Sequence, residues 1–178
     1  MYLLDANTFI EAKNRFYRQD ICPGFWAWLD DITLGDEIKS IEKVYDELAV
    51  GNDDLAGWVK ARRNEGRFLA VDTDIQNAFR RIVADVNATD YRAEAKRKFL
   101  AGADPWLVAT ALAHGATVVT HEKHEQQVRR RVPLPNVCRR FNVAFTDLFT
   151  LLAGQDVVFV RAGLNASGGG STHASALF

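Results

Sequence analysis

The sequence predicts an α/β protein built on a parallel β-sheet, and two observations lead to this fold class. Short apolar stretches typical of buried strands alternate with longer stretches of helical periodicity, which is the order found in parallel sheets with right-handed crossovers. Two of these strands, at residues 2–4 and 116–120, run into acidic residues, Asp5 and Glu122. Since ligands bind at the carboxyl edge of such sheets, we expect the functional site there.

The first part of the chain is expected to hold three strands and four helices. Asn7 or Thr8 can cap a short helix after the first strand, and a later helix opens at a proline. Its aromatic face, with Phe25, Trp26 and Trp28, is either a contact surface or ordinary core, and core is the preferred interpretation. The predicted elements are strands at 2–4, 38–41 and 68–71 and helices at about 8–15, 23–34, 41–50 and 54–66, the last capped by Asp53 or Asp54.

The second part of the chain is expected to be mainly helical. Thr73 and Gln76 match a capping box at the start of a long helix. Asp104 at the N-cap, Pro105 at the first position and Gly115 after the last residue mark another helix. The remaining predictions are a helix at 91–100, the strand at 116–120, helix or loop at 123–131, a proline-containing turn at 133–135, a helix at about 146–153 and an edge strand at 157–160.

The composition is ordinary for a soluble globular domain. The chain has 178 residues, 48% of them hydrophobic and 25% charged, with 22 basic and 23 acidic residues. No apolar run is long enough to span a membrane, and no signal peptide is expected. The predicted compartment is therefore the cytoplasm, where Cys22 and Cys138 would stay reduced. We expect one domain at residues 1–160 and a flexible Gly/Ser/Ala-rich tail at 161–178.

Acidic residues from different parts of the chain could meet at the carboxyl edge. Asp5 follows a buried strand, where a carboxylate needs a cation, hydrogen-bond donors or a metal ion. Asp104 is explained equally well as a helix N-cap, although its second oxygen could still bind a metal ion. Glu47 and Glu42 border the apolar stripe of one helix on opposite sides, so periodicity alone does not choose between them. The candidate set is Asp5, Glu47, Asp104 and Glu122.

Carboxylates at one edge repel each other unless a cation joins them. Oxygen ligands favour Mg²⁺ or Mn²⁺ over zinc, and such an ion activates water and stabilises the charge of an attacked phosphate. A zinc site is not expected at His121 and His124, because these residues are three rather than four positions apart. The acidic residues therefore predict a metal-dependent nuclease site.

Four blocks of sequence, in this order, resemble the PIN domain, the nuclease fold of VapC-type toxins. They are Leu3-Leu4-Asp5-Ala6-Asn7-Thr8, residues 40–48, Ala103-Asp104 with residues 107–111 and 115–116, and Val118-Val119-Thr120-His121-Glu122. The resemblance implies that residues 1–160 form a PIN-like nuclease domain. Its fold would be a three-layer α/β/α sandwich with a central parallel sheet of four to five strands.

The same resemblance implies an endoribonuclease that cuts single-stranded RNA with Mg²⁺ or Mn²⁺. Its catalytic, metal-binding residues would be Asp5, Glu47, Asp104 and Glu122, with Asn7 and Thr120 as second-shell support. Glu122 stands where the family commonly carries Asp, and the segment 53–102 is long compared with compact toxins. The chain therefore looks like a divergent branch of the family.

A VapC-like toxin implies an RNA substrate, a protein antitoxin and a homodimer, with no role for a membrane. Four basic residues follow the fourth acid: Lys123, Arg129, Arg130 and Arg131. They are expected either to position the RNA backbone or to form a solvated surface. The alternative function is a catalytically degenerate PIN-like module that binds RNA or protein without cutting. A phosphohydrolase with Asp5 as nucleophile is disfavoured, because Asn7 stands where that site expects an acid.

Overall fold

Strand β1 (Tyr2–Leu4) is the central strand of a five-stranded sheet in the computed structural model, which describes residues 1–160. The strand order is β3-β2-β1-β4-β5, and every pairing is parallel. The predicted α/β fold with a parallel sheet of four to five strands is therefore confirmed. The predicted tail at 161–178 lies outside the described residues. The other strands are β2 (Ile38–Ile41), β3 (Phe68–Leu69), β4 (Thr117–Val119) and β5 (Phe145–Thr146).

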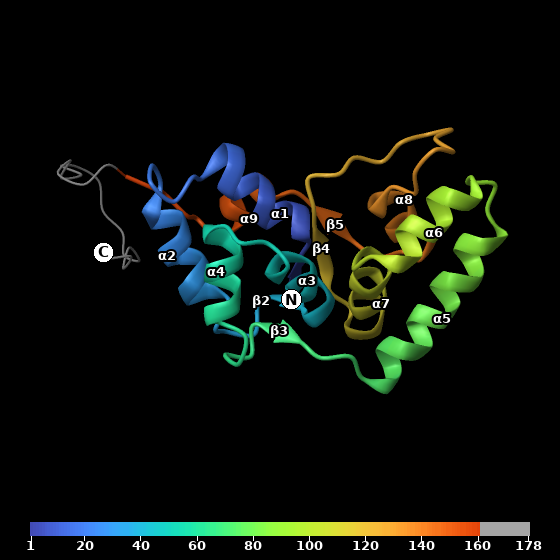
Figure 1. The fold of residues 1–178 in the computed structure, drawn as a ribbon, viewed down its shortest axis with the longest axis horizontal. Helices are drawn as coiled ribbons and strands as arrows, with labels where there is room; N and C mark the ends of the chain where they lie inside the picture. Colours follow the sequence, from blue (N-terminus) through green and yellow to red (C-terminus); the bar gives the residue numbers. More distant parts are fainter. Residues whose placement is uncertain (161–178) are drawn as a thin grey trace.

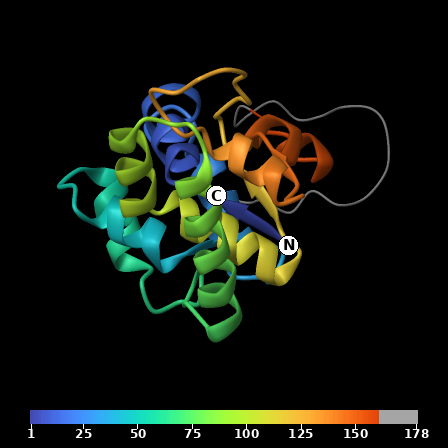
Figure 2. The same ribbon diagram turned by 90° about the vertical axis from the view of Figure 1, so that its right-hand side faces the viewer.

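Helices cover both faces of this sheet and complete the three layers. They are α1 (Ala6–Glu11), the π-helix η1 (Ala12–Phe16), α2 (Pro23–Ile32), α3 (Glu42–Ala49), α4 (Asp54–Ala61), α5 (Thr73–Ala88), α6 (Ala93–Ala101), α7 (Asp104–His114), α8 (Leu134–Arg140) and α9 (Leu148–Gly154). Figure 1 shows α1, α2 and α9 on one side of the sheet and α5, α6 and α7 on the other, and Figure 2 gives the view at right angles. Within residues 1–160, none of these helices has the length and hydrophobicity of a transmembrane span.

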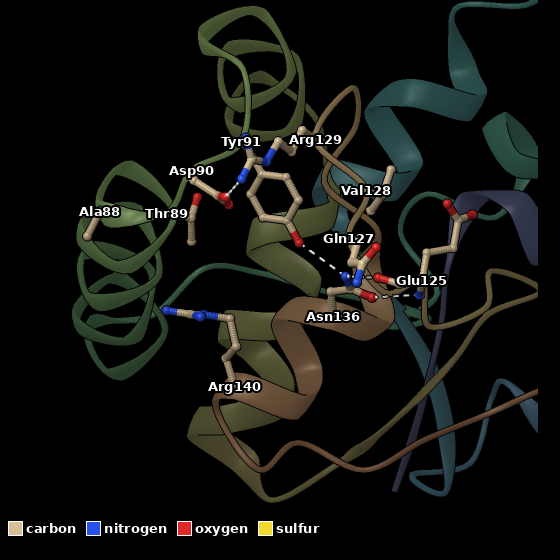
Figure 3. Close-up of a pocket in the computed structure, with 10 residues that line it drawn as sticks. All are labelled: Ala88, Thr89, Asp90, Tyr91, Glu125, Gln127, Val128, Arg129, Asn136 and Arg140. Carbon is tan, nitrogen blue, oxygen red and sulfur yellow. Dashed lines mark hydrogen bonds and ion pairs between the residues drawn. The ribbon is translucent and has the colours of Figure 1, made fainter.

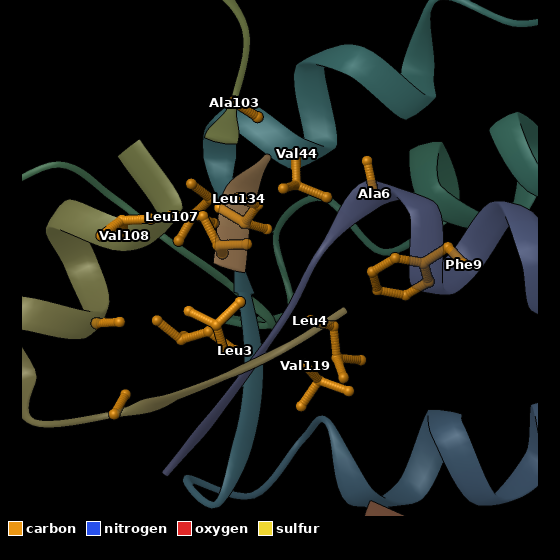
Figure 4. Packing of buried hydrophobic residues seen from close by; sticks show 14 of the residues in the cluster. Leu3, Leu4, Ala6, Phe9, Val44, Ala103, Leu107, Val108, Val119 and Leu134 are labelled. Carbon is orange, nitrogen blue, oxygen red and sulfur yellow. The ribbon is translucent and has the colours of Figure 1, made fainter. Parts of the chain in front are cut away.

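The core lies on both faces of β1. Leu3 and Leu4 are consecutive in a strand, so their side chains point to opposite faces of the sheet, and both are fully buried. In Figure 4, Leu3 lies near Leu107 of α7, whereas Leu4 lies beside Val119 of β4. Because a parallel strand is buried on both faces, it is continuously apolar, and this is why the strand could be predicted from its sequence.

The aromatic face of α2 belongs to the core. Phe25 and Trp26 are only 1% and 5% exposed. The Tyr17 ring stacks on Phe25 with the ring centroids 4.3 Å apart, and the Trp26 indole N–H donates a hydrogen bond to the Tyr17 carbonyl at 2.6 Å. The interpretation of this face as core is confirmed, and these two rings are not available to a partner.

Two helices have an aspartate side chain as their N-cap. Asp53 accepts a hydrogen bond from the backbone N–H of Ala56 at 2.9 Å, so it, rather than Asp54, caps α4. Asp72 accepts from the N–H of Ile75 at 2.8 Å and caps α5. The predicted capping box at Thr73 is therefore wrong. Both residues at 72 and 73 are good caps, and the extended backbone of Asp72 decides between them.

The segment after β4 differs most from the prediction. Residues 123–131 form a loop, which resolves the choice between loop and helix. The predicted turn at 133–135 is wrong, because α8 begins at Leu134. Pro133 stands at the N-cap position and Pro135 lies in the first turn, where the helix needs no N–H from a proline. Two prolines that indicated a turn therefore mark the start of a helix.

The edge strand predicted at 157–160 is also wrong. The hydrogen-bonding edge of β4 is taken by β5, and the Thr120 N–H donates to the Thr146 carbonyl at 2.9 Å. Val158 and Val160 are 77% and 71% exposed, so their apolar character does not reflect burial in a sheet. The last predicted helix is present as α9, and Asp147 caps it through a hydrogen bond from the N–H of Thr150.

One guanidinium group is buried beside the β2–β3 pair. Arg67 is 6% exposed. It donates hydrogen bonds to the Glu65 carboxylate at 2.6 Å, to the Thr33 hydroxyl at 2.5 Å and to the Asp30 backbone carbonyl. The Asp30 carboxylate lies 3.8 Å from the same guanidinium. Arg67 thus joins α2 to the sheet through polar contacts inside the protein.

Candidate active site

Asp5 and Thr120 lie side by side at the carboxyl edge of the sheet. The register pairs Leu4 with Val119, so the next residue of each strand follows at the same edge. The Thr120 hydroxyl donates a hydrogen bond to the Asp5 carboxylate at 2.8 Å. Asp5 and Thr120 are only 1% and 2% exposed. The parallel pairing of β1 and β4 therefore buries a carboxylate with a hydroxyl donor directed at it.

Asp5 also stands at the start of α1. This helix begins at Ala6, so Asp5 holds the N-cap position, and the predicted caps Asn7 and Thr8 are wrong. The Asp5 side chain makes no capping hydrogen bond. Thr8 instead donates its hydroxyl to the Val119 carbonyl at 2.9 Å, which fixes α1 to the end of β4. The Asp5 carboxylate is therefore held chiefly by the Thr120 hydroxyl, with a smaller contribution from the Asn7 N–H, and both lower its pKa.

Glu47 reaches the same edge from α3. Its carboxylate accepts a hydrogen bond at 2.7 Å from the backbone N–H of Ala103, the residue before Asp104. The negative charge of Glu47 contributes to the raised pKa of both Asp5 and Asp104. Glu42 is an exposed residue in the first turn of α3. The tertiary contact with Ala103 thus places Glu47 at the edge, which periodicity could not do.

Asp104 is the first residue of α7 and not its cap. Ala103 takes the N-cap position and Pro105 follows in the first turn, so the predicted N-cap role of Asp104 is wrong by one residue. Gly115 ends the helix in the left-handed conformation, with φ of 63°, as its position in the sequence predicts. Since Asp104 is not the N-cap of this helix, its partial burial beside other acids remains to be explained.

Ionisation is opposed at two of the four carboxylates, Asp104 and Asp5. Burial, followed by the negative charges of Asp5, Glu122 and Glu47, raises the pKa of Asp104 from 3.8 to about 8. Burial also raises the pKa of Asp5 to about 6; the Thr120 hydrogen bond acts against this shift, and the charges of Glu122 and Glu47 add to it. Like charges in a low-dielectric edge favour a proton or a bound cation. Asp5 and Asp104 therefore lie where a bound proton or cation is favoured.

Glu122 is held by α8, the helix that the sequence did not reveal. Its carboxylate accepts a hydrogen bond from the backbone N–H of Leu134 at 3.0 Å and lies 3.7 Å from the Arg131 guanidinium. The Glu122 N–H donates in turn to the Thr120 hydroxyl at 3.1 Å. Proline near the first helical position is the sequence signal that could have found this helix. Glu122 thus has partners of its own, unlike Asp104.

Cys138 of α8 packs close to the acidic residues. It is fully buried, as expected for a reduced thiol. Burial, followed by the charge of Asp104, raises the pKa of the Cys138 thiol to about 12. The thiol therefore stays protonated at neutral pH and acts as a small apolar group behind the carboxylates. Nothing in the sequence indicates that this residue lies at the site.

The type of donor at this edge fits a hard divalent cation. Asp5, Glu47, Asp104 and Glu122 offer only carboxylate oxygens, the ligands that Mg²⁺ and Mn²⁺ prefer. As placed within residues 1–160, however, no three acidic, imidazole or thiol side chains converge closely enough to coordinate one ion. The chemistry of the donors and the raised pKa values of Asp5 and Asp104 thus match such an ion, while the carboxylates are spaced more widely than its ligands would be.

A cleft of about 850 Å³ opens beside Glu122. Asn7, Lys123 and Arg131 line it, together with the rings of Phe16, His121 and Phe149. Asn7 is exposed at the start of α1, whereas Thr120, its predicted companion, is buried behind Asp5. The cleft therefore brings polar, basic and aromatic groups to the acidic edge.

The four predicted RNA-binding residues are not all at this cleft. Lys123 and Arg131 line it, and Arg131 forms ion pairs with Glu122 and Glu125. Arg129 pairs with Asp90 at 2.8 Å and lines a second pocket, and Arg130 is exposed on the loop between them. The loop conformation of this segment separates side chains that are consecutive in sequence.

The second pocket, of about 670 Å³, lies between the 123–131 loop and α8 (Figure 3). Asn136 is at its centre: its amide donates to the Tyr91 hydroxyl at 3.1 Å and to the Glu125 carbonyl at 2.8 Å, and accepts from the Glu125 N–H at 3.0 Å. These bonds attach the loop to α8 and to the start of α6. We interpret this pocket as part of the support of the loop.

Two solved structures are similar to this chain at low identity. FitAcB from Neisseria gonorrhoeae is 21% identical, with a TM-score of 0.47, over 82% of this chain and 96% of that chain. VapBC2 from Rickettsia felis, bound to a DNA fragment from its promoter, is 14% identical, with a TM-score of 0.48, over 82% of this chain and 97% of that chain. A comparison with curated proteins gives no match. Residues 2–159 match a sequence family described as a domain of unknown function, DUF4411, and the chain belongs to this family.

Proposed function

We propose that the protein is a metal-dependent endoribonuclease and the toxin of a toxin–antitoxin pair, acting in the cytoplasm. One observation carries the nuclease assignment: four carboxylates from separate elements lie near the carboxyl edge of the sheet, where burial and the charges of Asp5, Glu122 and Glu47 raise the pKa of Asp104 to about 8. Clusters of perturbed acids at such an edge are typical of functional sites. The resemblance of the same residues to the PIN domain gives the reaction class.

In this proposal Asp5, Glu47 and Asp104 hold Mg²⁺ or Mn²⁺, and Glu122 completes the site directly or through water. The ion, when bound, offsets the negative charge and activates water for attack on the phosphodiester. The protein's own contribution is orientation. The Thr120 hydroxyl fixes Asp5, the Ala103 N–H fixes Glu47, and the Leu134 N–H fixes Glu122. Asn7 stands at the mouth of the cleft, where its amide can hold a water or a phosphate oxygen.

Backbone binding is proposed for the basic loop after β4. Lys123 and Arg131 line the cleft next to Glu122, and in this proposal they would contact phosphates near the cut bond. Arg129 and Arg130 lie farther along the same loop and extend the positive surface. These contacts would set affinity without reading sequence.

The toxin role, the antitoxin and the homodimer are proposed from the resemblance to VapC-type toxins. Expression of the wild-type chain alone is expected to stop bacterial growth, whereas the Asp104→Asn chain is expected to be tolerated. Light scattering of the purified protein gives the mass that decides between monomer and dimer. Normal growth under full expression of a folded wild-type chain would contradict the toxin role.

A catalytically degenerate RNA- or protein-binding module is the second candidate. It is favoured by the engagement of Glu122, whose carboxylate is already bonded to the Leu134 N–H and paired with Arg131. This function predicts RNA or protein binding that does not need Mg²⁺ and does not change when Asp5 or Asp104 is neutralised.

The nuclease assignment is tested with purified protein and a pool of structured RNA, in Mn²⁺ or Mg²⁺ and in EDTA. We expect cleavage that needs the metal ion and that is lost in Asp104→Asn. Absence of cleavage with either ion, from protein shown to be folded, would favour the binding module.

Thr120→Val tests the orientation of Asp5. Removal of the hydroxyl is expected to weaken Mn²⁺ binding about 10- to 100-fold, as for other residues that support a metal ligand, because the Asp5 carboxylate loses its 2.8 Å donor. The measurement is the Mn²⁺ concentration that stabilises the protein against thermal unfolding. Thr117→Val, at the other end of β4, is the matched control. Equal Mn²⁺ affinity in the two variants would refute the role of Thr120.

A further inference from the structure

Three aromatic rings meet in the cleft beside the acidic edge. Phe16 and Phe149 pack edge to face with their ring centroids 5.0 Å apart. The His121 ring lies 5.3 Å from Phe16 and 5.7 Å from Phe149. The three residues come from the end of η1, from the residue before Glu122 and from α9. We refer to Phe16, His121 and Phe149 as the aromatic cluster.

The two phenylalanines of this cluster are unusually exposed. Phe16 is 43% exposed and Phe149 is 46% exposed, and among the described residues Phe145, at 36%, is the one other exposed aromatic side chain. Phe16 closes a π-helical turn in which the Tyr17 N–H donates to the Ala12 carbonyl at 2.7 Å. Such a turn inserts one residue into a helix and is frequent at functional sites. The turn brings the Phe16 ring to the cleft, where α9 supplies the second exposed ring.

The groups around the aromatic cluster complement a nucleotide. Arg15, Lys123 and Arg131 line the same cleft, together with four acidic residues, Glu11, Glu122, Glu125 and Asp147. Arg15 pairs with Glu11, and Arg131 pairs with Glu122 and Glu125, so Lys123 is the basic group best placed to contact a phosphate oxygen. Glu122 lies on the cleft wall, one residue from His121, so a nucleotide on the cluster is next to the proposed cutting site. Exposed aromatic rings are features that bind unpaired bases, because every base has a face that can stack. A duplex keeps its bases stacked inside and cannot use such rings.

We infer that the aromatic cluster is a base-stacking subsite, which receives one unpaired base of RNA beside the phosphodiester bond that is cut. The inference rests on the proposed nuclease function and adds to it the group that holds the neighbouring nucleotide. The exposed rings of Phe16 and Phe149 form the stacking surface, and the His121 ring supports them by packing against both. The subsite would explain why single-stranded RNA is selected, because only an unpaired base can stack on the rings of Phe16 and Phe149.

The test uses a single-stranded RNA oligonucleotide in which each base in turn is removed to leave an abasic position. Wild-type binding in EDTA is expected to weaken about tenfold or more at one position only. Phe149→Ala is expected to weaken binding of the intact RNA by a similar factor and to be insensitive to base removal at that position. Phe16→Ala is expected to behave in the same way. 2-Aminopurine at that position is expected to lose fluorescence on binding to the wild type and not to Phe149→Ala.

Three further variants separate stacking from folding. Phe149→Tyr keeps an aromatic ring and is expected to bind normally, whereas Phe149→Leu keeps an apolar side chain without a ring and is expected to bind weakly. Phe145→Ala changes a phenylalanine of similar exposure, 36%, that does not line the cleft, and is expected to bind normally. Binding that tolerates base removal at every position would overturn the inference. The inference would also be overturned if Phe149→Ala weakened the binding of intact RNA and of abasic RNA by the same factor relative to the wild type.

The outcomes also separate this inference from the proposed function. If the protein cleaves RNA with a metal ion but no position is sensitive to base removal, the base-stacking subsite is refuted and the nuclease function stands. Fluorescence loss in EDTA without cleavage in Mg²⁺ or Mn²⁺ refutes the nuclease and leaves an RNA-binding subsite. Loss of binding to a partner protein in Phe149→Ala, with RNA binding unchanged, would instead assign the cluster to that protein and overturn the inference.

Discussion

Asp104→Asn is expected to lower RNA cleavage at least about 100-fold and, in the metal-free protein at pH 8, to raise the free energy of unfolding by about 2–5 kcal/mol. Loss of activity follows from loss of a charged ligand at the proposed site. The gain in stability follows from removing a carboxylate whose ionisation is opposed by burial and by Asp5, Glu122 and Glu47. A change that destroys activity while stabilising the fold is the mark of a residue retained for function.

The pH window follows from the raised pKa. Asp104 titrates near 8 in the folded protein and near 3.8 when unfolded, so between these values the folded state binds more protons. The stability of the wild type therefore falls as pH rises from about 4 to about 8. Below pH 4, Asp104 is protonated in both the folded and the unfolded state, and the variant is no more stable than the wild type. Above pH 8, Asp104 is ionised in both states, and the variant exceeds the wild type in stability by the full amount. Asp5, with a pKa of about 6, changes stability in the same direction over a narrower range.

Urea unfolding in EDTA at pH 4.5 and pH 8 measures both stabilities. Asp54→Asn is the matched control, because Asp54 is the first residue of α4 as Asp104 is of α7, but it is exposed. The control is expected to cleave RNA normally and to gain no stability between these pH values. Equal stabilities of wild type and Asp104→Asn at pH 8 would contradict the mutual repulsion of the carboxylates.

Arg67→Met is expected to lower the free energy of unfolding by about 2–4 kcal/mol. The side chain is 6% exposed, and its removal leaves the Asp30 carbonyl and the Thr33 hydroxyl without their donor inside the protein. Met fills much of the volume, so the cost comes from unpaired polar groups rather than from a cavity. The Asp30 carboxylate keeps its bonds to Arg62, which limits the loss.

Urea unfolding at pH 7 measures this prediction too. Arg97→Met is the control, since Arg97 is exposed on α6, and a change within about 0.5 kcal/mol is expected there. RNA cleavage by Arg67→Met below its melting temperature is expected to be normal, because Arg67 makes no contact with the four acidic residues of the candidate active site. A loss of stability as small as that of the control would show that water replaces the guanidinium without cost.

The central sheet and its acidic edge could be predicted because they depend on local features. An apolar run followed by an acid identifies both β1 and β4, and the parallel order places Asp5 and Thr120 at one edge. Strand β5 could not be predicted in this way, because Phe145 and Thr146 are too few residues to show a period. The apolar run at 157–160 was misleading, since apolar content without a partner edge does not make a strand.

The site residues divide in the same way. Asp104 was selected because it lies at a predicted helix start, although the N-cap residue of that helix is Ala103. Periodicity did not choose between Glu47 and Glu42, and the resemblance to the PIN domain favoured Glu47. The contact of Glu47 with Ala103 joins residues 56 positions apart and leaves no local trace in the sequence. The role of α8 in holding Glu122 was missed because Pro133 and Pro135 suit a turn and a helix start equally well.

The hydrogen bond between Thr120 and Asp5 joins residues that are 115 positions apart. A ribosome therefore has to make most of the domain before the second side of β1 can be covered and the acidic edge can assemble. Parallel pairing over such a separation also forms slowly, because a long segment of chain has to be ordered first. Shorter chains that end before β4 would contain Asp5, Glu47 and Asp104 and still lack the edge that brings them to Glu122.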